Sequence, residues 1–165
     1  MEALLAAELP EGKGWQYEPK WDGFRCIARR DGNQAEMISR SGKDLGRYFP
    51  EVLDILRSTK ERRFTLDGEL ILPLGDRLDF EALQLRLHPA ESRIRRLAKE
   101  TPAQLMLFDL LELAGRSFGE KPLSARREAL ERFYARNRLT GLHLSPATHD
   151  RDVALGWLKI GRAHV

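Results

Sequence analysis

The sequence holds a single cysteine, Cys26, and this scarcity limits its chemistry. One cysteine excludes an internal disulfide, and without a second one no multi-cysteine metal site can form. The four histidines, His88, His143, His149 and His164, are not paired at the spacing of metal ligands. We therefore expect Cys26 to be a small buried hydrophobe in a strand, and the histidines to be structural or exposed to solvent.

Long apolar runs are also missing. No segment reaches the roughly 18 apolar residues of a membrane span, and the N-terminus lacks the charged-then-apolar pattern of a signal peptide. A chain of 165 residues, with 42% apolar and 32% charged residues, has the composition of one soluble globular domain. We expect a cytoplasmic protein with no membrane partner. The net charge of +3 and the pI near 9.2 fit a polyanionic partner without proving one.

A nucleophile, an acid and a turn meet in the stretch EPKWDGFR, from Glu18 to Arg25. Lys20 connects a segment that alternates like the end of a strand to one that alternates like the start of another. Lysine is charged near neutral pH, so a nucleophilic Lys20 needs burial or nearby cations that disfavour its charged form. The plainer alternative is a solvated lysine beside a turn at Asp22 and Gly23. Gly23 would supply positive φ or a close backbone approach.

The turn signal Asp-Gly-Asn at 31–33 separates two alternating segments. It predicts that strands 24–30 and 34–40 pair as an antiparallel hairpin. This pairing would bring Arg25 and Arg40 close together across the ladder. The alternative is that these arginines are two surface cations on a half-exposed sheet.

Two acidic residues flank a glycine in a predicted strand at 64–72. Alternation puts Asp67, Glu69 and Ile71 on one face, while the glycine marks a close approach of another backbone or a ligand. A face that binds a ligand or cations explains the acidic residues, and a solvated edge strand is the alternative.

The run at 104–111 is almost continuously apolar and predicts a strand buried on both faces. On this pattern alone, Phe108 belongs to the core. A turn should follow at 114–116.

Helical spacing and caps predict the remaining elements. The basic segment 91–99 has two readings, a solvated helix face or a contact with the DNA backbone. The predicted helices are 49–58, 79–87 with an Asp79 cap, 91–99, 123–137, and a last one from an Asp150 cap through Leu158; a short strand is predicted at 142–145.

Four segments together resemble the motifs of the covalent nucleotidyltransferases, the superfamily of ATP-dependent DNA ligases, RNA ligases and mRNA capping enzymes. They occur in the family's order, and the resemblance runs from about Trp15 to about Lys159. The bacterial ATP-dependent DNA ligases, including the type used in end joining, are the most similar. The motifs are KWDG at 20–23 with Arg25, SRSG at 39–42 followed by FPE at 49–51, LDGEL at 66–70, and LFDLL at 107–111.

The resemblance implies an α+β fold, with antiparallel sheets flanked by helices, and a role for each motif residue. Lys20 would attack the α-phosphate of ATP, while Arg25 and Arg40 contact the nucleotide. Glu69 would contact the ribose, and Phe108 would lie against the adenine ring.

Further roles follow from the same resemblance. Glu18 would contact the nucleotide, with Asp22, Gly23 and Asp67 in support. Mg²⁺ is the implied cofactor, and nicked or broken double-stranded DNA the implied partner. The metal-binding carboxylate, two phosphate-gripping lysines and an oligonucleotide-binding domain would follow the last residue of this sequence.

The predicted function is that of an ATP-dependent DNA ligase in DNA repair or recombination, and the resemblance implies a bacterial, nucleoid-associated protein. The alternatives are an RNA ligase, a GTP-using capping-type enzyme, or a non-catalytic nucleotide- or DNA-binding module. We expect a lead-in at 1–14 and a partial adenylation domain at 15–159. Residues 160–165 resemble a translated sequencing adapter and are expected to be a non-native tail, so the domain should be truncated and weakly active at most.

Overall fold

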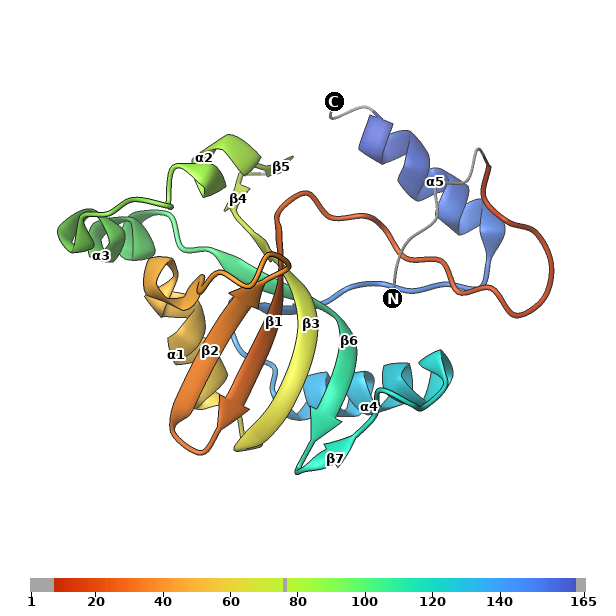
Figure 1. Ribbon diagram of the computed structural model, residues 1–165. Helices are drawn as coiled ribbons and strands as arrows, with labels where there is room; N and C mark the ends of the chain where they lie inside the picture. Colours follow the sequence, from red (N-terminus) through yellow and green to blue (C-terminus); the bar gives the residue numbers. More distant parts are fainter. Residues whose placement is uncertain (1–7, 76, 163–165) are drawn as a thin grey trace. The chain divides into compact units, whose positions relative to one another are not determined.

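The computed structural model describes residues 8–75 and 77–162, which divide into two compact units (Figure 1). The larger unit runs from Trp21 to Leu144 and contains most of the motif residues. The smaller unit combines the chain up to Lys20 with the chain from Ser145 onward. The predicted lead-in at 1–14 and tail at 160–165 lie partly outside the described residues.

A six-stranded sheet organises the larger unit. Five strands follow the order β2-β1-β3-β6-β7 in antiparallel pairs, and β8 pairs with β6 in parallel. The sheet comprises β1 (Phe24–Asp31), β2 (Gln34–Ser39), β3 (Arg63–Ile71), β6 (Gln104–Leu113), β7 (Arg116–Ser117) and β8 (Leu142–Leu144). A separate two-stranded hairpin comprises β4 (Pro73–Leu74) and β5 (Arg77–Leu78). The predicted α+β class is confirmed.

The predicted hairpin is confirmed by the register of β1 and β2, in which Ile27 pairs with Ile38. Its turn has two residues, and Gly32 at the first of them has a φ of 61°. Tight two-residue hairpin turns need positive φ there, which glycine adopts without steric cost.

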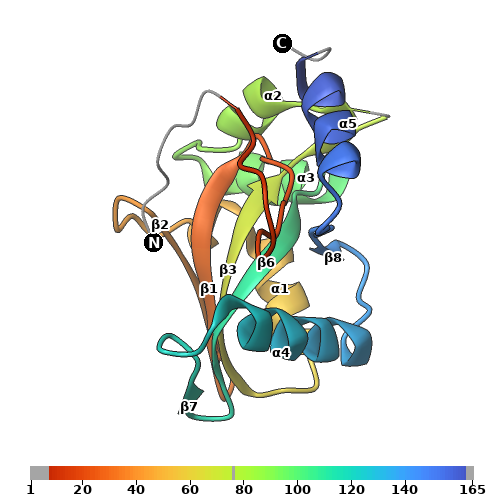
Figure 2. The same ribbon diagram turned by 90° about the vertical axis from the view of Figure 1, so that its right-hand side faces the viewer.

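The helices lie close to their predicted positions. They are η1 (Gly46–Tyr48, a 3-10 turn), α1 (Pro50–Ser58), α2 (Phe80–Gln84), α3 (Glu91–Glu100), α4 (Leu123–Arg136) and α5 (Arg151–Arg162). Figure 2 shows α4 and β8 beside β6, in agreement with the strand pairing and packing. None of the helices in the described part of the chain is long and apolar enough to cross a membrane.

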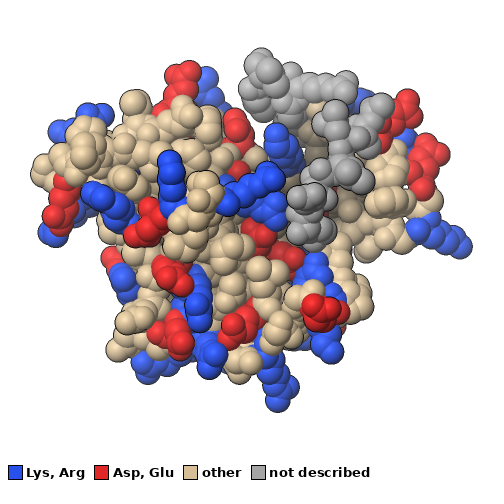
Figure 3. All heavy atoms as spheres, in the orientation of Figure 1, with Lys and Arg blue, Asp and Glu red and all other residues tan. Residues whose placement is uncertain are grey.

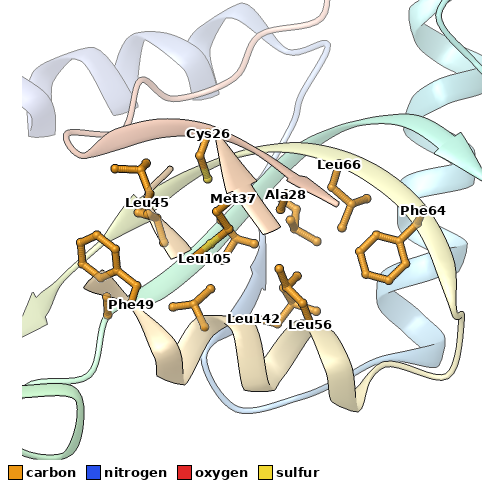
Figure 4. Packing of buried hydrophobic residues seen from close by; sticks show 14 of the residues in the cluster. Cys26, Ala28, Met37, Leu45, Phe49, Leu56, Phe64, Leu66, Leu105 and Leu142 are labelled. Carbon is orange, nitrogen blue, oxygen red and sulfur yellow. The ribbon is translucent and has the colours of Figure 1, made fainter. Parts of the chain in front are cut away.

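Helices α1 and α4 pack on one face of the sheet, which we call the core face. Leu66 and Leu105 point from the sheet toward Leu56 of α1 (Figure 4), and Phe64 meets Phe133 of α4 edge-on at 5.0 Å between ring centroids. Cys26 also belongs to this cluster, as predicted. Its burial raises the pKa of the thiol to about 12, so Cys26 stays protonated and unreactive.

Helix α2 is shorter than the predicted 79–87, although its Asp79 cap is confirmed by a 2.8 Å bond from the Ala82 N–H. The helix ends early because Arg86 turns into the interior. Its guanidinium is 1% exposed and pairs with Glu51 of α1 at 2.7 Å. It also donates to the Tyr48 carbonyl, so the segment gives up a helical turn for a buried ion pair.

The smaller unit is held by backbone and side-chain bonds around Tyr17. Its N–H and carbonyl bond to those of Thr148 at 2.8 and 3.0 Å, and its hydroxyl donates to the Pro10 carbonyl. The segment before Lys20, which alternates like the end of a strand, therefore forms only a single bridge at Tyr17. Asp150 caps α5 as predicted, accepting the Asp152 N–H at 2.8 Å, but the helix continues to Arg162, past the predicted end at Leu158.

Candidate functional site

Charged residues gather on the second face of the sheet, opposite the core face, and we call it the polar face. On β3 the alternation is as predicted, with Phe64, Leu66 and Leu70 fully buried on one side. Asp67 and Glu69 lie on the other, and Glu69 is the direct β-ladder partner of Arg25 on β1. The motif acids therefore face a cation rather than open solvent.

Arg25 is held by two neighbours. Its Nε and Nη2 donate to the two Asp67 carboxylate oxygens at 3.1 and 2.8 Å, and its guanidinium lies 5.4 Å from the centre of the Phe108 ring. The bond to Asp67 raises the pKa of Arg25, with further support from Glu69 and Asp109. The permanently charged guanidinium thus lies over the ring that the family resemblance assigns to adenine.

Glu69 is poised to change its charge near neutral pH. Burial raises the pKa of its carboxyl to about 7, although Arg25 and a backbone bond from Gly23 oppose the shift. A carboxyl with this pKa can either accept or donate a hydrogen bond at physiological pH. This is the kind of perturbed group that is enriched at binding sites.

Gly23 is required by close packing and not by its dihedral angles. A Cβ atom at Gly23 would lie 2.0 Å from the Leu70 carbonyl oxygen. The part of the prediction that invoked positive φ is wrong, because Gly23 is not among the described glycines with positive φ. Its missing side chain lets the start of β1 approach β3 beside Glu69.

Phe108 is half-buried on the polar face, and not in the core as the apolar run alone suggested. The register between β3 and β6 explains its position. Asp67 pairs with Asp109 and Gly68 pairs with Leu107, so Phe108 has no partner on β3. Such an extra residue is a β-bulge, which re-aims a side chain and interrupts alternation.

Asp109, next to Phe108, pairs with an arginine that sequence reasoning did not single out. Arg126 Nε lies 2.9 and 3.0 Å from the two Asp109 oxygens, and Arg126 Nη1 donates to the Lys121 carbonyl. The available signal was an acid beside the aromatic residue of a motif and an arginine in the following helix. Nothing in the sequence links the two.

A hydrogen-bonded loop closes the end of β2. Gly42, with a φ of 79°, donates its N–H to the Ser39 carbonyl, and the Lys43 N–H donates to the Ser39 hydroxyl at 3.0 Å. These bonds fix the backbone from which Arg40 and Lys43 project. Both side chains are exposed, and no ion pair of either is found within residues 8–75 and 77–162.

A hollow of about 650 Å³ lies over the end of β2, the start of β1 and β3, all within the larger unit. The predicted site residues Gly23, Arg25, Arg40 and Glu69 line it. Sequence reasoning missed an apolar wall and also Lys43, although Lys43 directly follows the SRSG motif. The wall comprises Phe24, Leu45 and Leu87.

Lys20, Glu18 and Asp22 are placed as follows. Lys20 is exposed and is the last residue of the smaller unit before the division, so the burial proposed for a nucleophilic lysine is not present. Glu18 accepts a bond from the Gln16 side chain at 2.6 Å. Asp22 is exposed and adds negative charge near Glu69.

The structure provides less support for a metal site and for a DNA-binding surface than for the nucleotide site. Among the described residues, no group of three or more His, Cys, Asp or Glu is arranged to hold a metal ion. On α3, Arg95 pairs with Glu91 and Arg96 with Glu100, as expected of a solvated helix face. Figure 3 likewise shows acidic and basic side chains interleaved on the face in view. A DNA contact of α3 stays a prediction.

The fold is that of solved ligase domains. The ligase domain of LigD from M. tuberculosis matches with a TM-score of 0.65 at 24% identity, covering 89% of this chain and 45% of that chain. This likeness identifies the nucleotidyltransferase fold of the DNA ligases.

The chain belongs to the ATP dependent DNA ligase domain family, whose model matches residues 5–159. DNA ligase C1 of Mycolicibacterium smegmatis is 44% identical over 164 residues, 96% of this chain and 47% of that protein. DNA ligase C of Mycobacterium tuberculosis is 46% identical over 149 residues, 86% of this chain and 40% of that protein. The family predicted from the four motifs is confirmed, and the chain spans about half or less of these relatives' length.

Proposed function

We propose that this chain is the nucleotide-binding part of an ATP-dependent DNA ligase that forms a covalent enzyme–AMP on Lys20. The observation that supports it is the order of side chains across four neighbouring strands. Phe108 lies on β6, Glu69 on β3, Arg25 on β1, and Arg40 just after β2.

This order parallels that of the parts of a nucleotide. An aromatic ring suits the base, a carboxyl group accepts bonds from ribose hydroxyls, and guanidinium groups bind phosphate oxygens in pairs. Neighbouring strands lie about 4.8 Å apart, so three steps across the sheet take a nucleotide from base to phosphates. Lys43 adds a further cation to the two arginines at the phosphate end.

Adenine and Arg25 compete for one face of Phe108. In the free protein Arg25 occupies this face and is neutralised by Asp67. Adenine stacking there displaces the guanidinium from the ring. Arg25 can then leave the Asp67 carboxylate and bind phosphate oxygens, so that it has a negatively charged partner in both states. Nucleotide entry and phosphate binding are therefore linked through Arg25.

The chemistry of Lys20 follows that of an amine nucleophile. Its neutral Nζ forms a bond to the α-phosphorus, the bond to the bridging oxygen breaks, and pyrophosphate leaves while the nitrogen loses a proton. Three peptide links join Lys20 to Gly23, so their Cα atoms lie within about 11 Å of each other whatever the local conformation. The pocket arginines offset the charge that develops on the phosphates.

AMP transfer to DNA completes the proposed reaction. An oxygen of a DNA 5′-phosphate attacks the phosphorus of Lys20–AMP, the P–N bond breaks, and the lysine nitrogen regains a proton. A 3′-hydroxyl then attacks the activated 5′-phosphate, which releases AMP and seals the strand. Mg²⁺ is a prediction from the resemblance only, and the described residues offer no ligand cluster for it, so no step is assigned to it.

The test follows label from nucleotide to protein under single-turnover conditions with the protein in excess. ATP labelled at the α-phosphate should leave alkali-stable, acid-labile label on the protein, as expected of a P–N bond, and ATP labelled at the γ-phosphate should leave none. GTP labelled at the α-phosphate serves as the competitor. Label from GTP alone would identify a capping-type enzyme and reject the proposal.

A second outcome addresses the non-catalytic alternative, which the exposure of Lys20 favours. Saturable ATP or DNA binding without any label transfer at high ATP and Mg²⁺ would identify a binding module. Calorimetric titration with ATP and with nicked DNA measures both affinities directly.

A further inference from the structure

We propose that Arg126 and Asp109 act as a positioning pair that fixes the strand segment presenting Phe108 to the nucleotide base. The inference rests on the proposed function, since it takes the base to lie against Phe108. Neither residue is assigned to contact the nucleotide itself.

The geometry of the pair is that of a rigid clamp. Arg126 Nε contacts both Asp109 oxygens at 2.9 and 3.0 Å, and the two side chains are only 11% and 9% exposed. Arg126 Nη1 donates to the Lys121 carbonyl at 2.7 Å, just before α4 begins. A guanidinium fixed at several donors loses little further freedom, so it holds its partner in one orientation.

The Asp109 carboxylate also bonds the strand itself. Its Oδ1 accepts the Leu110 N–H at 2.8 Å, directly after the bulge at Phe108. The clamp thus joins the start of α4 to the backbone of β6 beside the bulged residue. Because a bulge is a local interruption of the ladder, its conformation depends on such side-chain contacts more than that of regular strand does.

Arg126 also neutralises one of two neighbouring carboxylates. Asp109 and Asp67 are direct partners across β6 and β3, and like charges placed so are destabilising. Arg126 neutralises Asp109, which leaves Asp67 to hold Arg25. Without Arg126, both carboxylates would compete for Arg25, the cation that covers Phe108 in the free protein.

A double-mutant cycle on this chain tests the link between the pair and Phe108. The dissociation constant of ATP is measured by calorimetry for wild type, Phe108→Ala, Arg126→Gln and the double variant. Each single change should weaken ATP binding about tenfold, which is the scale of one lost base–aromatic contact. The double variant should also be about tenfold weaker and not a hundredfold, because Arg126 acts through Phe108.

Two variants keep the test interpretable. Arg126→Lys retains one charged contact to Asp109, so its ATP affinity should be closer to wild type than that of Arg126→Gln. If Arg126→Gln fails to fold, Arg126→Lys takes its place in the cycle. Arg30→Met removes another buried arginine, one bonded to the Thr59 carbonyl at the far end of β1. It should lower the unfolding temperature and leave ATP affinity unchanged.

The outcomes separate this inference from the proposed function. If wild type binds ATP and Phe108→Ala weakens it, but Arg126→Gln is neutral or multiplies with Phe108→Ala, the positioning role is overturned and the proposed function stands. Loss of affinity in Arg30→Met equal to that in Arg126→Gln would mean a general loss of structure and also overturn it. No ATP binding by folded wild type would overturn both.

Discussion

The two faces of the central sheet are built on different principles, although they share the same strands. On the core face, apolar side chains such as Leu66, Leu70 and Leu105 are fully buried and interchangeable in chemistry. On the polar face, two acidic residues have specific partners, since Asp67 pairs with Arg25 and Asp109 pairs with Arg126. The core face supplies stability through area removed from water, whereas the polar face supplies a few fixed groups for binding.

The difference predicts that changes on the two faces have separable effects. Truncation on the core face should lower the free energy of unfolding and spare nucleotide affinity in the folded fraction. Changes to the charged residues of the polar face should lower nucleotide affinity and have a smaller effect on the free energy of unfolding.

The largest effect on stability is expected for Leu66→Ala. Leu66 is 0% exposed in the shared cluster, so truncation leaves a cavity and costs about 2–5 kcal/mol of unfolding free energy. Chemical denaturation measures this loss. Well below the denaturation midpoint, ATP affinity should match wild type, and a selective loss of affinity would show that the two faces are not independent.

Gly23→Ala should lower both stability and nucleotide affinity, because the close packing at Gly23 holds together the strands that carry the binding residues. The added Cβ would lie 2.0 Å from the Leu70 carbonyl, so β1 must shift from β3, at a cost of about 1–3 kcal/mol. Affinity should fall as well, since Arg25 and Glu69 sit on the displaced strands. Gly119→Ala is the matched control, because Gly119 has no positive φ and a Cβ atom there would meet only the Ser117 hydroxyl at an ordinary 3.7 Å. Equal behaviour of the two variants would refute the close-packing explanation.

Glu69 should produce the smallest effect on stability, visible as a pH dependence. Its folded-state pKa of about 7 lies above the reference value of 4.5, so between these values the folded chain binds more protons than the unfolded chain. The free energy of unfolding therefore falls as the pH rises through this window. The slope should be well below about 1.4 kcal/mol per pH unit, since solvent screens a half-exposed carboxyl group.

The Glu69 carboxyl group should also make ATP affinity depend on pH. If ionised Glu69 accepts bonds from ribose hydroxyls, ATP affinity should weaken below pH 7, because a proton must first leave. Glu69→Gln should flatten the pH dependence of both the unfolding free energy and the ATP affinity relative to wild type. ATP itself also titrates in this range, but equally with both proteins, so subtracting one affinity profile from the other cancels its contribution. Identical profiles would contradict the raised pKa.

Much of this arrangement followed from the sequence because it depends on local pattern. The hairpin at 31–33, the Asp79 cap and the alternation that puts Asp67 and Glu69 on one face are all set by neighbouring residues. The resemblance added the family and the functional roles.

The rest depends on contacts between distant residues. The bulge at Phe108 comes from the register of β3 with β6, which neither strand specifies alone. The pair of Arg25 and Asp67 joins residues 42 positions apart, and Arg126 reaches Asp109 from another element. Arg86 shortened α2 for the same reason, since its partner Glu51 lies on α1. Periodicity identifies a face, but not which charges on it meet.

The most direct test of the account locates the AMP group after prolonged incubation with ATP. Peptide mapping by mass spectrometry should find AMP on Lys20, in however small a yield. Lys20→Ala should carry none, and Lys43→Ala should still react at Lys20, because Lys43 binds phosphate without attacking it. AMP on another residue, AMP retained in Lys20→Ala, or no AMP on wild type would contradict the assignment of Lys20 as the nucleophile.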